Sequence, residues 1–167
     1  MIEVVQRNYL EINSIQDLNN VVKPTEDYSL NLLEPINFQL NKFFYKNIGK
    51  KHKWIDRLVW TETQWIDYVS SEKVETYIFK YRDDLAGFFE LISHTKKKEV
   101  EIAYFGLLEE FQNKKLGSYL LSQAIKKSFK INVDRVWAHT CSLDHKNALS
   151  NYIARGMKIF KSETIKI

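Results

Sequence analysis

The hydrophobic pattern changes its period near the middle of the chain, and this change constrains the fold more than any other feature. Three consecutive segments with strand character are separated by short polar turns, and they span 76–81, 85–93 and 100–107. Short turns favour antiparallel pairing of neighbouring strands. Further on, the period alternates between helix (116–129, 146–154) and strand (135–140, 157–161). The sequence therefore predicts an α/β (α+β) fold, with an antiparallel first half and strand–helix–strand crossovers in the second.

Two helices are expected before these strands. Apolar residues recur at helical spacing from Ile36 to Ile48, and Gly49 follows as a stop signal. Thr61 and Gln64 have the spacing of a capping box at the start of a helix that runs to Val69. Residues 1–35 are less regular, with strand character at 9–12 and 30–33. We expect residues 1–35 to form an arm packed on a single globular domain of residues 36–167.

Composition narrows the class of protein. The chain has 167 residues, of which 44% are hydrophobic, and this suits one globular domain. Cys141 is the only cysteine, so an intrachain disulfide and a cysteine-based zinc site are both excluded, and no metal is expected. The first residues lack the order of a signal peptide, and no run of about eighteen apolar residues occurs. We expect a cytoplasmic protein with no membrane partner.

The net charge of +4 suits a ligand that carries phosphates, whether a cofactor or a nucleic acid. The lysine clusters lie on separate turns and helices rather than with aromatic residues on one face. This distribution disfavours a nucleic-acid partner. The oligomeric state stays open, with a homodimer among the alternatives.

Two ordered motifs resemble those of the GNAT acetyltransferases. Residues 101–121, EIAYFGLLEEFQNKKLGSYLL, combine a strand, a polar turn and a helix, and they resemble the acetyl-coenzyme A motif of that superfamily. Residues 135–141, followed by Ala148, Tyr152, Gly156 and Met157, are similar to the family's next strand and its Ala-x-x-x-Tyr-x-x-x-Gly-Phe helix end. The resemblance covers about residues 74–163. It implies a GNAT domain over 36–167, with a mixed, mostly antiparallel sheet that is flanked by helices and splayed at the cofactor site.

The resemblance also implies a reaction: transfer of the acetyl group of acetyl-coenzyme A (acetyl-CoA) to a primary amine of a small molecule or peptide. The alternative is a non-catalytic module of the same fold that binds acyl-coenzyme A. A turn that opens into a helix N-terminus presents partial positive charge, and this suits a pyrophosphate. Taken alone, the same turn is equally an ordinary polar connection. The residues expected to contact the cofactor are Phe105, Gly106, Leu107, Gln112, Asn113, Lys114, Lys115, Leu116, Gly117, Ser118 and His145.

Three of these residues depart from the family pattern. Lys115 stands where the family usually has glycine, and Asn113 stands where glycine is frequent. A missing Cβ lets the backbone approach a phosphate closely, so Lys115 either supplies an ammonium group to the phosphates or crowds them. His145 replaces an asparagine, seven positions before Tyr152.

Glu101 and Tyr152 are the expected catalytic residues. An ammonium must lose a proton before its nitrogen can attack, and Glu101 lies at the offset where the histone-acetylating members carry a catalytic glutamate. Tyr152 matches the family's helix tyrosine, which is expected to protonate the departing thiolate. The alternative for Glu101 is a glutamate on the solvent-exposed face of a strand, and the alternative for Tyr152 is an aromatic residue of the core. Backbone N–H groups at 105–107 are expected to stabilise the developing oxyanion.

The remaining polar residues carry weaker expectations. Trp54, Asp56 and Arg57 are expected to line the acceptor pocket or to close the core. His139 is expected to be a satisfied core imidazole, and Asp144 a helix N-cap. Cys141 is expected to be a small buried thiol rather than a nucleophile, because no activating partner is evident from the sequence.

Overall fold

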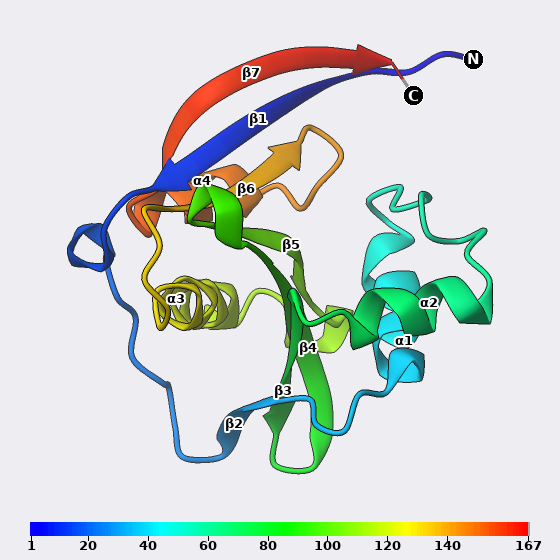
Figure 1. Ribbon diagram of the computed structural model, residues 1–167, viewed down its shortest axis with the longest axis horizontal. Coiled ribbons are helices and arrows are strands. Elements are labelled where there is room, and N and C mark those ends of the chain that lie inside the picture. Colours follow the sequence, from blue (N-terminus) through cyan, green and yellow to red (C-terminus); the bar gives the residue numbers. More distant parts are fainter. Residues whose placement is uncertain (167) are drawn as a thin grey trace.

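A seven-stranded sheet runs through the computed structural model, which describes residues 1–166 (Figure 1). The strand order is β2-β3-β4-β5-β6-β1-β7. Only β5 and β6 pair in parallel; every other neighbouring pair in this sheet is antiparallel. The strands are β1 (Val4–Ile12), β2 (Tyr28–Leu32), β3 (Val74–Tyr81), β4 (Asp84–His94), β5 (Glu99–Leu107), β6 (Arg135–Cys141) and β7 (Lys158–Lys166).

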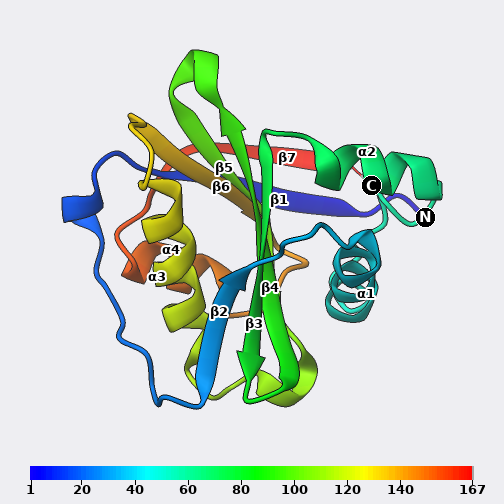
Figure 2. The same ribbon diagram turned by 60° about the horizontal axis from the view of Figure 1, so that its bottom comes forward.

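Helices cover both faces of the sheet, as the views in Figures 1 and 2 show. One face carries α1 (Phe38–Gly49) and α2 (Glu62–Ser70), and the other carries α3 (Leu116–Ser128) and α4 (Ala148–Ala154). The predicted mixed, mostly antiparallel α/β fold is therefore confirmed. No helix of residues 1–166 has the length and apolar character needed to cross a membrane.

The predicted helix boundaries follow from local capping. Thr61 Oγ1 accepts a hydrogen bond from the Gln64 backbone N–H, and the Gln64 side chain accepts one from the Thr61 N–H, so the capping box is present. Asn37 is the N-cap of α1, and its side-chain oxygen accepts a hydrogen bond from the Gln39 backbone N–H. The α4 helix begins at Ala148, two residues later than expected, with Asn147 as its first flanking residue.

The N-terminal segment contributes directly to the sheet. Strand β1 lies between β6 and β7, and β2 forms the opposite edge beside β3. Leu10 and Ile12 of β1 are buried in the main core because they face α3. We expected an arm packed on the domain; instead, residues 1–35 supply one interior strand and one edge strand. The strand character at 9–12 and 30–33 is present in β1 and β2, but a local pattern does not specify the pairing partner.

A buried carboxylate ties the two helices of one face to the sheet. Glu90 on β4 is fully buried and accepts hydrogen bonds from Arg57 Nη1 at 2.9 Å, Tyr68 Oη at 2.8 Å and Asn41 Nδ2 at 2.8 Å. The Arg57 guanidinium lies 4.1 Å from the ring centre of Tyr68 and 4.3 Å from that of Tyr104. Cation–π contacts of this kind favour a charged guanidinium inside an apolar shell. Asn41 lies on α1, Arg57 in the following loop and Tyr68 on α2, so one side chain anchors three segments.

We predict that Glu90→Gln lowers the free energy of unfolding by about 3–5 kcal/mol, because the buried Arg57 charge then loses its counter-ion. Urea denaturation measures the change. The matched control is Glu75→Gln, which removes a partly exposed pair with Lys130 and costs about 1 kcal/mol or less. Equal losses in the two variants would contradict the assigned role of Glu90.

Candidate active site

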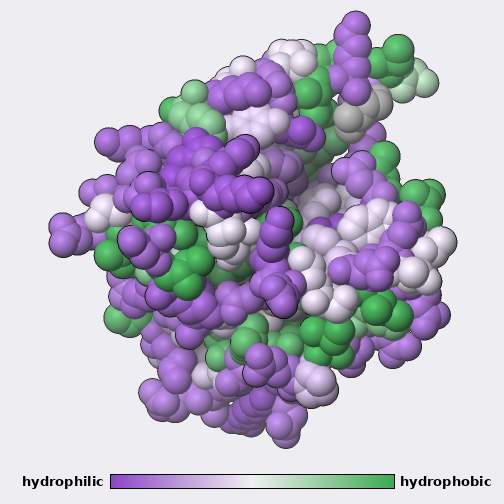
Figure 3. Space-filling view, viewed as in Figure 1, coloured by the Kyte–Doolittle hydropathy of each residue, from purple (hydrophilic) through white to green (hydrophobic). Residues whose placement is uncertain are grey.

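A cleft opens where two neighbouring strands separate. The pairing of β5 with β6 extends over only three residue pairs, from Glu99 with Arg135 to Glu101 with Trp137. Beyond Glu101 the two strands diverge, and the β6-facing edge of residues 102–107 lines a cavity of about 920 Å³. The space-filling view shows a hollow between the part of the molecule that carries β6 and α4 and the part that carries α1 and α2 (Figure 3).

Most of the residues expected to contact a cofactor line this cleft. They are Phe105, Gly106, Leu107, Gln112, Asn113, Lys115, Gly117, Ser118 and His145. Two expected residues do not line it. The Leu116 side chain is buried in the core, where it anchors the start of α3, and the Lys114 ammonium lies 5.6 Å from the centre of the Phe111 ring.

The turn before α3 contains two residues in the left-handed backbone region. Asn113 has φ 61° and Lys115 has φ 63°. Glycine adopts this conformation without steric cost, so the family preference for glycine at both positions has a backbone reason in addition to close approach by a phosphate. Gln112 Nε2 donates to the Leu107 carbonyl at 3.1 Å, and Asn151 Nδ2 donates to the Gly117 carbonyl at 3.1 Å. These bonds tie the turn to β5 and α4.

Arg155 is a cleft residue that the sequence did not suggest. It follows α4, lines the cleft and is 8% exposed, yet its Nε and Nη1 atoms have no hydrogen-bond partner among residues 1–166. Burial lowers the pKa of this guanidinium, and no carboxylate side chain of residues 1–166 offsets the shift. An arginine before a helix-ending glycine is an ordinary pattern, so no local signal marks it.

The two expected catalytic residues occupy different settings. Tyr152 is 7% exposed and lines the cleft, with its ring centre 6.4 Å from that of Phe105. Burial raises the pKa of the Tyr152 phenol, and the Asp144 carboxylate acts in the same direction. Glu101 lies outside the cleft walls, and its Oε1 atom is 3.1 Å from His94 Nε2. Direct contact of Glu101 with a bound amine is therefore not built into the cleft.

His139 is exposed on the cleft wall, so the expectation of a core imidazole is wrong. The neighbouring Ala138 points into the core against α3, and alternation along β6 turns His139 to the opposite face. Partial desolvation inside the cleft lowers the pKa of His139, and the positive charge of Arg7 lowers it further, whereas Glu101 acts in the opposite direction. A neutral imidazole that can accept a proton is thus the favoured form.

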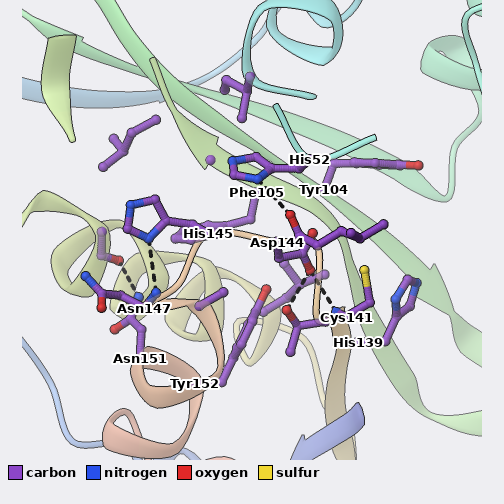
Figure 4. Close-up of a pocket in the computed structure, with 18 of the residues that line it drawn as sticks. His52, Tyr104, Phe105, His139, Cys141, Asp144, His145, Asn147, Asn151 and Tyr152 are labelled. Carbon is purple, nitrogen blue, oxygen red and sulfur yellow. Dashed lines mark hydrogen bonds between the residues drawn. The ribbon is translucent and has the colours of Figure 1, made fainter. Parts of the chain in front are cut away.

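Asp144 has a different role from the expected helix cap. Its Oδ2 atom accepts hydrogen bonds from Thr140 Oγ1 at 2.6 Å and from the Cys141 N–H at 2.9 Å, and it closes the turn after β6 (Figure 4). Asn147, not Asp144, immediately precedes α4. Cys141 is half-buried and lines the cleft, and burial raises the pKa of its thiol, so the less reactive protonated form is favoured.

The opposite wall of the cleft comes from the segment between α1 and α2. Trp54 and Asp56 line the cleft as expected, and the Trp54 ring lies 4.9 Å from the ring of Tyr104 on β5. Arg57 does not line it, because its guanidinium points to Glu90 and is 6% exposed. Two of the three expected acceptor residues thus line the cleft, and the third, Arg57, packs in the core beneath this wall.

Comparison with known proteins identifies the family. The Acetyltransferase (GNAT) family matches residues 37–157, which is most of the chain. The chain belongs to the GNAT acetyltransferase family. No match to a curated protein is found.

Solved structures share the fold of this GNAT protein. A GCN5-related N-acetyltransferase from Sphaerobacter thermophilus superposes with a TM-score of 0.73 at 13% identity, covering 98% of this chain and 52% of that one. Another, from Kribbella flavida, has a TM-score of 0.67 at 12% identity, covering 99% and 58%. A Bacillus subtilis acetyltransferase solved in complex with CoA has a TM-score of 0.54 at 25% identity, covering 77% and 75%. The present chain thus spans 52% to 58% of the length of the first two proteins.

We predict that the GNAT domain loses stability as the pH falls below about 6.5, in part through His139. Its pKa in the folded protein is lower than the ordinary value of 6.5, so the unfolded chain binds the proton more readily below that pH. His139→Gln removes this contribution and flattens the decline, which thermal denaturation from pH 7.5 to 5 measures. His145, whose pKa burial also lowers, continues to contribute in the variant. An unchanged pH dependence would contradict the prediction.

Proposed function

We propose that this GNAT protein is an N-acetyltransferase that moves the acetyl group of acetyl-CoA directly to a primary amine of a small molecule or peptide. One observation carries the proposal: the divergence of β5 and β6 brings an open strand edge, the start of a long helix and the buried Tyr152 hydroxyl into one cleft. The open edge of 102–107 suits the amide groups of a pantetheine arm, which can pair with it as a further strand does.

The residues at the α3–α4 end of the cleft fit the phosphates of coenzyme A. The N–H groups at the start of α3 have no intrahelical partners, and the helix dipole favours an anion there. Arg155 adds a buried guanidinium in the same cleft, and two of its nitrogens have no partner among residues 1–166. When bound, acetyl-CoA supplies an acetyl group activated as a thioester. We assign Ser118, Lys115 and Arg155 to the phosphates, and Phe105 to Leu107 to the pantetheine arm.

Proton transfer in this proposal uses three side chains. The neutral His139 imidazole on the cleft wall accepts the proton of the acceptor ammonium, and the Glu101 carboxylate stabilises the imidazolium. The neutral amine then attacks the thioester carbon, the nitrogen loses its second proton, and the carbon–sulfur bond breaks; that second proton balances the one that Tyr152 gives to the sulfur. Tyr152, which its raised pKa keeps protonated, donates a proton to the departing sulfur. Glu101 thereby keeps a role in base catalysis, through His139 rather than by direct contact.

The second candidate is a module that binds acyl-coenzyme A without turnover. The observation that favours it is the position of Glu101, which lies outside the cleft walls and contacts His94. An assay of thiol release from acetyl-CoA over a panel of amines separates the two functions. Amine-dependent release supports the enzyme, whereas tight coenzyme A binding without release by any amine supports the module.

We predict that Arg155→Met weakens coenzyme A binding by about tenfold to a hundredfold, the value of one or two hydrogen bonds to a charged group. Its salt dependence should also be shallower, because one cation fewer meets the phosphates. Titration calorimetry at several salt concentrations measures both effects. Lys126→Met is the matched control, because Lys126 is exposed on α3 and does not line the cleft. A parent-like affinity of Arg155→Met would remove Arg155 from the cofactor site.

We predict that His139→Gln lowers kcat/KM on a confirmed acceptor by about 10²- to 10⁴-fold, the usual effect of removing a general base. Glu101→Gln has a smaller effect and moves the acid limb of the pH–rate profile to lower pH, because the charge that raises the pKa of His139 is gone. Tyr152→Phe lowers kcat without moving that limb.

Lys96→Gln is the control for these variants, because Lys96 is exposed in the turn between β4 and β5. If His139→Gln turns over like the parent while Glu101→Gln does not, Glu101 is the direct base and the relay is wrong. If all three variants match the parent, none of the assigned roles holds.

A further inference from the structure

The arginines of this protein divide into two groups. Three of the five form ion pairs with carboxylates: Arg57 with Glu90, Arg82 with Asp27, and Arg135 with both Glu11 and Glu99. Arg7 and Arg155 form no ion pair with residues 1–166, and both line the cleft. Each also has a buried guanidinium nitrogen without a hydrogen-bond partner in that part of the chain. A partly buried guanidinium that lacks an anion is destabilising unless a ligand supplies one.

The two unpaired arginines lie on opposite sides of the sheet. Leu10 on β1 pairs with Ala138 on β6, and both are buried in the core against α3. Alternation then turns Arg7 and its cross-strand partner Cys141 to the other face, together with His139. Arg155 belongs to the α3–α4 side, where the phosphates of the cofactor are assigned. Arg7 therefore lies on the same side of the sheet as His139, in the half of the cleft that Trp54 and Asp56 close from the other wall. We call this part the acceptor half.

Burial lowers the pKa of the Arg7 guanidinium, and Tyr9, Cys141 and Glu163 raise it above its ordinary value, yet no carboxylate of residues 1–166 forms an ion pair with it. The Arg7 Nη1 atom is 3.5 Å from Tyr9 Oη, the outer limit for a hydrogen bond, and the Arg7 Nε atom has no partner in the described part of the chain. Glu163 stands opposite Arg7 on β7, but Glu163 Oε1 accepts a hydrogen bond from Tyr9 at 2.7 Å, and its other oxygen is 3.7 Å from Lys161 Nζ. The guanidinium thus keeps donors for a ligand in the cleft.

The acceptor half also contains an opposite charge. Asp56 comes from the segment between α1 and α2 and lines the same cleft, whereas Arg7 and His139 come from β1 and β6. One wall therefore presents a carboxylate and the other a guanidinium beside a neutral imidazole. This distribution complements a ligand that carries an ammonium and a carboxylate.

We propose that Arg7 binds a carboxylate of the acceptor, and that the acceptor class is small amino carboxylic acids, that is, free amino acids. This proposal rests on the N-acetyltransferase function proposed above. Arginine binds a carboxylate through two parallel hydrogen bonds, which fix orientation as well as supply energy. Anchoring the carboxylate on β1 directs the amine toward His139 and the divergence of β5 and β6. Arg7 is thus a residue that determines specificity rather than one that transfers protons.

The test compares matched acceptors that differ only in the carboxylate. The panel contains free amino acids, their carboxamides and their decarboxylated amines, for example phenylalanine, phenylalaninamide and phenethylamine. We expect at least one amino acid to exceed its amide in kcat/KM by about tenfold to a hundredfold, as a charge-assisted contact allows. Arg7→Met should abolish this preference by raising KM for the acid while leaving the amide unchanged. Arg7→Lys should retain part of it, since the charge remains but the two-pronged geometry is lost.

Arg82→Met is the matched control, because Arg82 lies in the exposed turn between β3 and β4 and does not line the cleft. It should keep the full preference for the acid. Calorimetric titration of the same amino acids and amides into protein saturated with coenzyme A gives a readout that needs no turnover. A melting curve establishes that Arg7→Met is folded, and if it is not, the comparison of acid with amide in the parent decides the matter.

The outcomes separate this proposal from the proposed function. If amines release coenzyme A but acids and amides react equally well, the carboxylate site is overturned and the N-acetyltransferase stands. If no amine is acetylated but amino acids bind in an Arg7-dependent manner, the carboxylate site stands and the reaction is wrong. If amino acids do not bind, or bind equally to Arg7→Met, the carboxylate site is overturned.

Discussion

The early end of the pairing between β5 and β6 is the constraint on which the site depends. Three residue pairs hold the two strands together, and beyond Trp137 their backbones separate. A sheet interior normally satisfies every N–H and C=O group, so an open edge inside the sheet requires a ligand or solvent to complete it. The same divergence makes a passage from the α3–α4 face to the α1–α2 face. In the proposed reaction, cofactor and acceptor would therefore meet at one point while each is bound on its own side.

The cleft wall formed by the segment between α1 and α2 depends on an interaction that lies behind it. Glu90 holds Arg57, Tyr68 and Asn41 in one buried cluster, and this cluster joins α1, α2 and their connecting segment to β4. Trp54 and Asp56 belong to that segment, so the positions of both follow from an ion pair that never contacts the cleft. Gly106 lets α1 approach β5 closely, because a Cβ at this position would lie 2.8 Å from the Ile48 side chain on α1.

Each side of the sheet contributes one arginine to the cleft. Arg155 near α4 and Arg7 on β1 have buried guanidinium nitrogens without a hydrogen-bond partner within residues 1–166, and an anionic group at each would offset the cost of desolvation. Burial lowers the pKa of His139, the neighbouring Arg7 lowers it further, and Glu101 raises it. A carboxylate bound at Arg7 would screen the positive charge of Arg7 and so raise the pKa of His139. Binding of an amino acid would therefore make His139 a stronger base. In the proposed mechanism, recognition and proton transfer would thus be linked through one neighbouring charge.

Local sequence determined the secondary structure and predicted the turn that lines one half of the cleft. Three features depend only on residues close together in the chain: the capping box at Thr61, the three-stranded meander and the turn of 112–118. Their patterns can therefore be recognised in the sequence before the fold is known. The tertiary structure alone decided the rest. Pairing of β1 between β6 and β7 joins residues more than 120 positions apart, and it places Arg7 beside His139. No local pattern specifies such a partner, because alternation along a strand records which face is buried but not which strand lies next to it.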